Sequence, residues 1–153
     1  MNQTERIIGS EILRKLPYEP NSQQMEIIAA LSKFVADTDG RSVFLLNGYA
    51  GTGKTSLAGA LVAALPALRR QAVLLAPTGR AAKVFAAYSR HSAFTIHRKI
   101  YQSRRYNPED SHFCLARNNH KNTLFIVDEA SMIANNASEG AVFGTGCLLD
   151  DLI

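Results

Sequence analysis

The segment at residues 48–55 constrains the fold more than any other part of this sequence. It reads GYAGTGKT and fits the pattern G-x-x-x-x-G-K-[ST] at every fixed position. Its glycines allow a tight loop whose backbone N–H groups converge on phosphate oxygens. The apolar run at residues 42–47 predicts a buried strand before the loop, and residues 54–65 predict a helix whose positive end faces the same anion. The chain is therefore expected to fold around a phosphate-binding loop.

Strand and helix patterns alternate along the chain, which predicts an α/β fold with a mainly parallel sheet and flanking helices. Two more buried strands are expected at residues 71–76 and 123–127, the latter reached through a hairpin that starts at residue 113. Residues 102–111 are expected to form a loop. We predict an N-terminal helix within residues 1–17 and one domain over residues 18–153. The other helices are expected at residues 21–35, 54–65, 80–88 and 94–101, with Asn21 and Gln24 as a capping box.

Two carboxylates follow the strand predicted at residues 123–127. Asp128 stands where that strand ends, at the edge where open α/β sheets bind ligands, and would hold Mg²⁺. Glu129 would orient or deprotonate an attacking water, while Lys54 would contact the β- and γ-phosphates and Thr55 would ligate the metal. The pattern favours ATP hydrolysis. A GTPase is disfavoured because the tetrapeptide N-K-x-D is missing from the sequence.

Charge is unevenly distributed along the chain. Residues 69–121 hold eleven basic and two acidic side chains, whereas residues 122–153 hold five acidic and no basic ones. A basic segment suits a phosphate-backbone partner, although a solvated basic surface is the alternative. The two cysteines are too few for a disulfide framework or a structural metal site, and no apolar run is long enough for a membrane span. We expect a cytoplasmic, DNA-associated protein.

Several segments, in their order along the chain, carry a family resemblance. They read GYAGTGKTS at residues 48–56, APTGRAAK at 76–83, TIHR at 95–98 and VDEASM at 127–132. Together they resemble the RecD-like DNA helicases, the B subclass of superfamily-one helicases. A weaker match, NSQQ at residues 21–24, places Gln24 where these helicases carry an adenine-reading glutamine. The resemblance covers residues 18–153 and corresponds to part of the first RecA-like motor domain of a P-loop NTPase.

The resemblance implies an ATP-driven motor that moves 5′ to 3′ on single-stranded DNA, with ATP and Mg²⁺ as cofactors. It assigns catalysis to Lys54 and Glu129, and the metal to Thr55 and Asp128. Nucleotide contacts are expected from Gln24, Gly48, Ala50, Gly51, Thr52, Gly53, Lys54, Thr55 and Ser56. DNA contacts are expected from Pro77, Thr78, Gly79, Arg80, Lys83, Thr95, His97 and Arg98. Base stacking by Tyr101, Tyr106 and Phe113 is less favoured, because aromatic residues at the base of a hairpin usually pack.

One departure from the family pattern follows Met132. No G-D-x-x-Q-L-P-P segment and no second RecA-like domain come after it. We therefore expect a partial motor domain that is inactive as a helicase by itself and whose partner would be a second motor domain. Two other functions stay open: a non-hydrolysing nucleotide-binding module that recruits a partner, and another DNA-associated ATPase such as a AAA-type loader.

Overall fold

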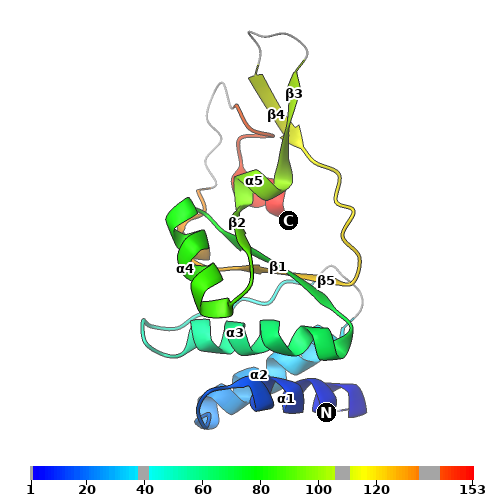
Figure 1. The fold of residues 1–153 in the computed structure, drawn as a ribbon, viewed down its shortest axis with the longest axis vertical. Coiled ribbons are helices and arrows are strands. Elements are labelled where there is room, and N and C mark those ends of the chain that lie inside the picture. Colours follow the sequence, from blue (N-terminus) through cyan, green and yellow to red (C-terminus); the bar gives the residue numbers. More distant parts are fainter. Residues whose placement is uncertain (1, 38–41, 106–110, 135–141) are drawn as a thin grey trace. The chain divides into compact units, whose positions relative to one another are not determined.

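The computed structural model describes residues 2–37, 42–105, 111–134 and 142–153. The chain forms two compact units, Met1–Ala72 and Val73–Ile153, whose elements are labelled in Figure 1. The first unit contains the N-terminal helix together with the phosphate loop. The domain boundary predicted at residue 17 stays a prediction.

Helices make up the first unit. It contains α1 (Gln3–Lys15), α2 (Ser22–Ala36), α3 (Lys54–Ala64) and the 3-10 turn η1 (Leu65–Leu68), and α1 packs against both α2 and α3. Apolar side chains at helical spacing, such as Ile8 and Ile12 in α1, are buried. The predicted start of α2 is confirmed: Asn21 and Gln24 exchange side-chain to backbone hydrogen bonds as a capping box.

The strand predicted at residues 42–47 is wrong. The segment leads to the phosphate loop without pairing to any strand in the described part of the chain. Val43 and Leu45 are more than 70% exposed, whereas Phe44 packs its ring 5.5 Å from that of Phe34. An apolar run becomes a buried strand only when neighbouring strands accept its backbone hydrogen bonds. Here residues 43–46 alternate between exposed and half-buried side chains, as in a strand, but the segment has no ladder of backbone hydrogen bonds to a described strand.

A three-stranded sheet organises the second unit, in the order β2-β1-β5 (Figure 1). Its strands are β1 (Gln71–Ala76), β2 (Ala93–Thr95) and β5 (Thr123–Val127). The pairing of β1 with β2 is parallel and sets Ala76 opposite Thr95. Helix α4 (Gly79–Ser89) connects these two strands and contacts β2. The predicted α/β class is confirmed.

Three local predictions in this unit are corrected. The helix expected at residues 94–101 begins only at Ile96 as α5 (Ile96–Ile100), because the residues before it pair with β1 as a strand. The loop expected at residues 102–111 contains strand β3 (Tyr101–Arg105) and the first residue of β4 (Ser111–Leu115). These two strands pair with each other in antiparallel fashion, so β4 forms no hairpin with β5. Tyr106 lies outside the described residues.

The strand β5 is half-buried along its whole length, not buried on both faces as predicted. It stands at an edge of the described sheet, where one side has no neighbouring strand. Beyond it come η2 (Ala130–Met132) and the short helix α6 (Leu148–Leu152). Leu148 and Leu152 of α6 pack against the core formed by Val73, Leu75 and Ile96. The C-terminal segment, which carries no clear sequence pattern, is thus part of this unit's core.

Candidate functional site

The phosphate loop turns through two glycines in the left-handed region. Gly51 has φ +78° and Gly53 has φ +88°, a conformation that side chains with a Cβ seldom adopt. Gly53 is also the N-cap of α3 and has no side chain with which to cap it. The first N–H groups of α3, beginning at Lys54, therefore keep their hydrogen-bonding capacity for an anion. This part of the site fits a phosphate group.

The Lys54 side chain folds back over the loop. Its Nζ donates hydrogen bonds to the carbonyl oxygens of Gly48 at 2.6 Å and Tyr49 at 2.8 Å. The Thr52 hydroxyl donates to the same Tyr49 carbonyl at 2.8 Å. These contacts hold the ammonium group within the turn, so a phosphate oxygen would have to compete with two carbonyl oxygens for it.

Two residues from outside the loop pack against Gly53. The Gln24 amide donates from Nε2 to the Thr52 carbonyl at 3.2 Å, while its Oε1 accepts from the Asn21 N–H. A Cβ placed on Gly53 would lie 2.7 Å from the Tyr18 hydroxyl and 2.9 Å from Gln24 Nε2. Gln24 therefore lies at the loop, as its predicted nucleotide contact requires. The sequence did not single out Tyr18, and no motif marks it.

The two carboxylates of the second unit follow β5 directly. The Asp128 N–H donates to the Leu75 carbonyl at 3.0 Å, which fixes the end of β5 beside that of β1. Glu129 adopts φ +54°, an uncommon conformation for a residue with a side chain, and its N–H donates to Asp128 Oδ1 at 3.0 Å. Such backbone conformations, which carry strain of about 1–3 kcal/mol, cluster at functional sites. Glu129 is exposed and Asp128 is half-buried.

The predicted DNA-contact segments meet at one edge of this sheet. Thr78 follows β1 and caps α4, its hydroxyl oxygen accepting from the Ala81 N–H at 3.2 Å. Thr95 ends β2 and caps α5, accepting from the Arg98 N–H at 3.2 Å. Because Ala76 and Thr95 are partners in a parallel pair, both helix starts lie at the same edge. Each hydroxyl also has a proton that it could donate to a phosphate.

The cationic side chains near this edge have two kinds of surroundings. Arg80 and Lys83 of α4 are exposed to solvent. The Arg98 guanidinium and the Lys99 ammonium lie 5.8 Å and 5.5 Å from the centre of the Phe94 ring, in the range of a cation–π contact. Phe94 itself packs against the core of the unit, which anchors both cations.

His97 is placed differently from its neighbours. Its ring lies 5.7 Å from that of Tyr101 and 5.2 Å from that of Phe143, so it belongs to an aromatic cluster at the base of the hairpin. Phe113 stacks on Phe143 at 4.6 Å, and Tyr101 is buried. Tyr101 and Phe113 therefore pack within the protein, as the sequence favoured over base stacking.

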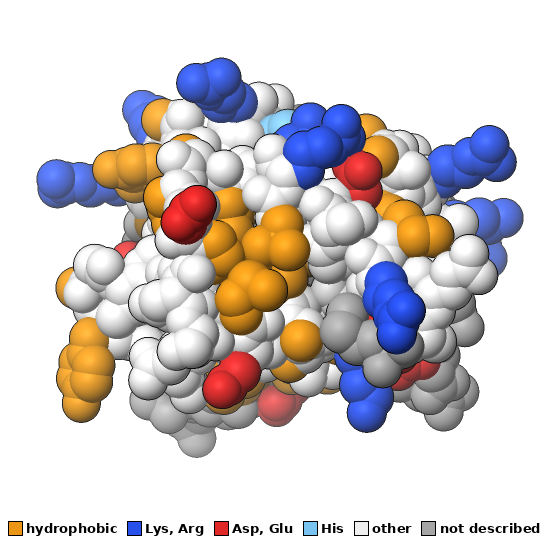
Figure 2. All heavy atoms as spheres, turned by 90° about the horizontal axis from the view of Figure 1, so that it is seen from below, with side chains coloured by type: hydrophobic (Ala, Val, Ile, Leu, Met, Phe, Trp, Pro, Cys, Tyr) orange, Lys and Arg blue, Asp and Glu red, His pale blue; other side chains and the backbone are white. Residues whose placement is uncertain are grey.

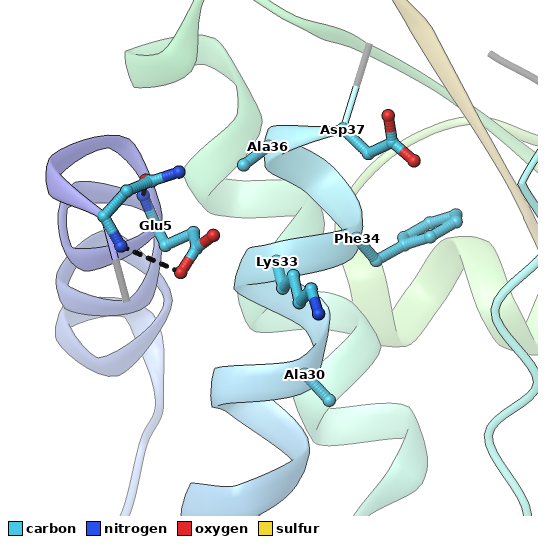
Figure 3. A pocket seen from close by; sticks show the side chains of 7 residues that line it. Glu5, Ala30, Lys33, Phe34, Ala36 and Asp37 are labelled. Atoms are coloured by element: carbon cyan, nitrogen blue, oxygen red, sulfur yellow. Dashed lines mark hydrogen bonds between the residues drawn. The ribbon is translucent and has the colours of Figure 1, made fainter. Parts of the chain in front are cut away.

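The first unit also has a surface hollow. An open hollow of about 450 Å³ between α1 and α2 is lined by none of the predicted site residues (Figure 3). Figure 2 shows hydrophobic side chains gathered among charged ones on one face, and the exposed large hydrophobic residues include Ile7 and Met25. Within the described ranges no helix is long and apolar enough to cross a membrane. No group of three His, Cys, Asp or Glu side chains there is arranged to hold a metal ion.

The comparisons with known proteins identify a family. The family described as "AAA domain" matches residues 20–142, which is well over half of the chain. The matched region includes the phosphate loop, the segments after β1 and β2, and the two carboxylates after β5. No curated protein matches the chain.

Proposed function

We propose that this chain, which belongs to the AAA domain family of P-loop ATPases, is the ATP-binding and ATP-hydrolysing motor domain of a helicase that moves 5′ to 3′ along single-stranded DNA. By itself it would be inactive as a helicase, because translocation requires a second motor domain. The proposal assigns the nucleotide to Gln24 and residues 48–56, and the metal to Thr55 and Asp128. It assigns Glu129 to the attacking water and the DNA to residues around Thr78 and Thr95.

The observation that carries the nucleotide part is the loop at the start of α3. Its left-handed glycines, the uncapped first turn of α3 and the ammonium of Lys54 are the parts that a phosphate site requires. Bound Mg²⁺ would neutralise charge on the phosphates. Lys54 would exchange its two carbonyl partners for phosphate oxygens, and Glu129 would accept a proton from water.

The DNA part rests on the parallel register of β1 and β2. It brings together two threonine-capped helix starts that are far apart in sequence, with Arg80 and Lys83 exposed on α4. Hydroxyl and N–H donors fix a phosphate backbone in place, and cations supply attraction that does not depend on sequence. This arrangement favours a nucleic-acid strand over a small-molecule substrate at this edge.

The nucleotide assignment is tested by Lys54→Ala. A charge-assisted contact to phosphate is worth about 1.5–3 kcal/mol, so Mg·ATP affinity measured by calorimetry should fall by about 10- to 150-fold. Lys33→Ala serves as the matched control, because Lys33 is an exposed cation of the same unit that lies on α2. Equal affinities for the wild type and Lys54→Ala, with equal stability of the two proteins to urea unfolding, would refute the assignment.

The DNA assignment is tested by Arg80→Ala combined with Lys83→Ala. Each lost phosphate contact on a single strand lowers the slope of log affinity against log salt by about 0.7. Fluorescence anisotropy with a labelled oligonucleotide should therefore show a slope reduced by about 1.4. The pair Arg117→Ala and Lys121→Ala removes the same charge from exposed positions in the segment between β4 and β5. If both pairs reduce the slope equally, the basic surface acts only through its total charge.

A further inference from the structure

A tyrosine–aspartate pair joins β3 to α6 in the second unit. The Tyr101 hydroxyl, at the start of β3, donates to Asp151 Oδ2 of α6 at 2.6 Å. Asp151 also accepts from Thr145, at 3.0 Å from the backbone N–H and at 2.9 Å from the hydroxyl. A buried tyrosine hydroxyl needs such a partner, and the carboxylate is held from a second side. The pair therefore fixes the Tyr101 ring.

The C-terminal segment that contains Asp151 also contributes Phe143 to the aromatic cluster around His97. Phe143 lies 5.4 Å from the Tyr101 ring and 5.2 Å, edge to face, from the His97 imidazole. The backbone around Phe143 is bound to β4 on both sides. The Phe113 N–H donates to the Val142 carbonyl at 3.0 Å, and the Gly144 N–H donates to the Phe113 carbonyl at 2.8 Å. The His97 ring thus meets two rings that are themselves fixed.

A side chain at Gly144 would not fit beside Asp151 and Tyr101. A Cβ on Gly144 would clash with Asp151 Oδ2 and would lie 2.6 Å from Tyr101 Cε1, and Gly144 has φ +47°. Figure 1 shows the C-terminal segment (red) at the base of β3 and β4, beside α5, and α5 and α6 are in contact. The pair, Phe143 and His97 therefore form one closely packed group.

We propose that Tyr101 and Asp151 are positioning residues that hold the His97 imidazole ready for the DNA strand. The inference rests on the proposed function, because it adds to the DNA edge a support made by the segment after Phe143. A side chain that is already immobilised loses less rotamer freedom on binding, which raises affinity without a new contact. Tyr101 and Asp151 act through His97 and need not touch DNA themselves.

The experiment is a double-mutant cycle on the full chain with a labelled single-stranded oligonucleotide. Tyr101→Phe keeps the ring and removes the hydrogen bond, Asp151→Asn keeps the shape and removes the charge, and His97→Ala removes the supported side chain. Each single variant should weaken DNA binding by about three- to tenfold. Combining Tyr101→Phe with His97→Ala should weaken it no further than His97→Ala alone, because both remove the same contact.

A second readout separates positioning from general support of the fold. In nuclear magnetic resonance spectra of the free protein, Tyr101→Phe and Asp151→Asn should shift the His97 ring signal and weaken its contacts to Phe143. Tyr88→Phe is the control, because it removes the hydroxyl of an exposed tyrosine on α4. It should leave both the His97 signal and DNA affinity unchanged.

The outcomes distinguish the two proposals. If His97→Ala weakens DNA binding while Tyr101→Phe and Asp151→Asn do not, the positioning role is refuted and the DNA edge stands. If Tyr101→Phe weakens binding equally in the presence and absence of His97, its role is general support and the inference fails. If His97→Ala leaves DNA affinity unchanged, the predicted DNA contact of His97 is itself wrong, and the inference falls with it.

Discussion

Alanine substitutions at the two left-handed glycines of the phosphate loop provide a matched pair. Both Gly51→Ala and Gly53→Ala place a Cβ where φ is near +80°, which costs about 1–2 kcal/mol. At Gly51 the Cβ meets nothing within 4 Å, so backbone strain is its only effect on the folded state. At Gly53 it displaces the Tyr18 hydroxyl and Gln24 Nε2 and breaks the hydrogen bond to Thr52, which adds about 1 kcal/mol.

Gly53→Ala should therefore destabilise the first unit by about 2–3 kcal/mol, and Gly51→Ala by about 1–2 kcal/mol. The entropy that alanine removes from the unfolded chain is common to both variants and cancels in the difference. The measurement is urea unfolding followed by circular dichroism. In a background with both Tyr18→Ala and Gln24→Ala, the difference between the two variants should vanish. Equal destabilisation in the wild-type background would refute the contact between this pair and the loop.

Three further predictions concern the second unit. In a protein that also carries a second motor domain, Glu129→Gln should keep ATP binding while lowering turnover more than tenfold, since it keeps the shape and removes the base; binding without turnover in that protein with Glu129 intact would favour a non-hydrolysing module. Thr78→Ala should lower stability to thermal unfolding by about 1 kcal/mol through loss of its cap to the Ala81 N–H, whereas Thr78→Ser should keep the cap. Burial, together with the bond to Asp151, raises the pKa of Tyr101 above its usual 10.0, so the folded state binds the phenolic proton more tightly. Its stabilising contribution is complete below pH 10 and falls above it, and Tyr101→Phe should flatten that loss in a pH series of urea titrations.

The sequence correctly predicts those helices and strands whose ends are marked by local residues, such as a capping box or a proline. Asn21 and Gln24 start α2 because a capping box satisfies exposed N–H groups locally. The run before Pro77 becomes β1, and Asp128 follows β5, because strand and turn residues there agree. The same local signals identified the loop at residues 48–55 and the helix after it. The roles predicted for these residues in binding and catalysis remain predictions.

Errors arose where structure depends on distant partners. The run at residues 42–47 has the composition of a strand, but a strand requires a neighbour, and pairing is not encoded locally. Residues 94 and 95, which the sequence places at the start of a helix, belong to β2 because β1 accepts them in parallel register. Asp151 lies fifty residues from Tyr101, and nothing in either local sequence reveals that they meet. Tyr18 was missed for the same reason.

The position of Lys54 has a consequence for how any measurement on it is interpreted. Its ammonium donates to two carbonyl oxygens of the loop, so phosphate binding would exchange one set of partners for another. The change in ATP affinity on removing the lysine is then the strength of its phosphate contacts minus that of its contacts with the two loop carbonyls. It underestimates the attraction between lysine and phosphate by the strength of the contacts given up. A weak effect of Lys54→Ala on affinity would thus be compatible with a strong phosphate contact only if the variant also destabilised the free loop. Unfolding and calorimetry on the same protein would report the two terms separately.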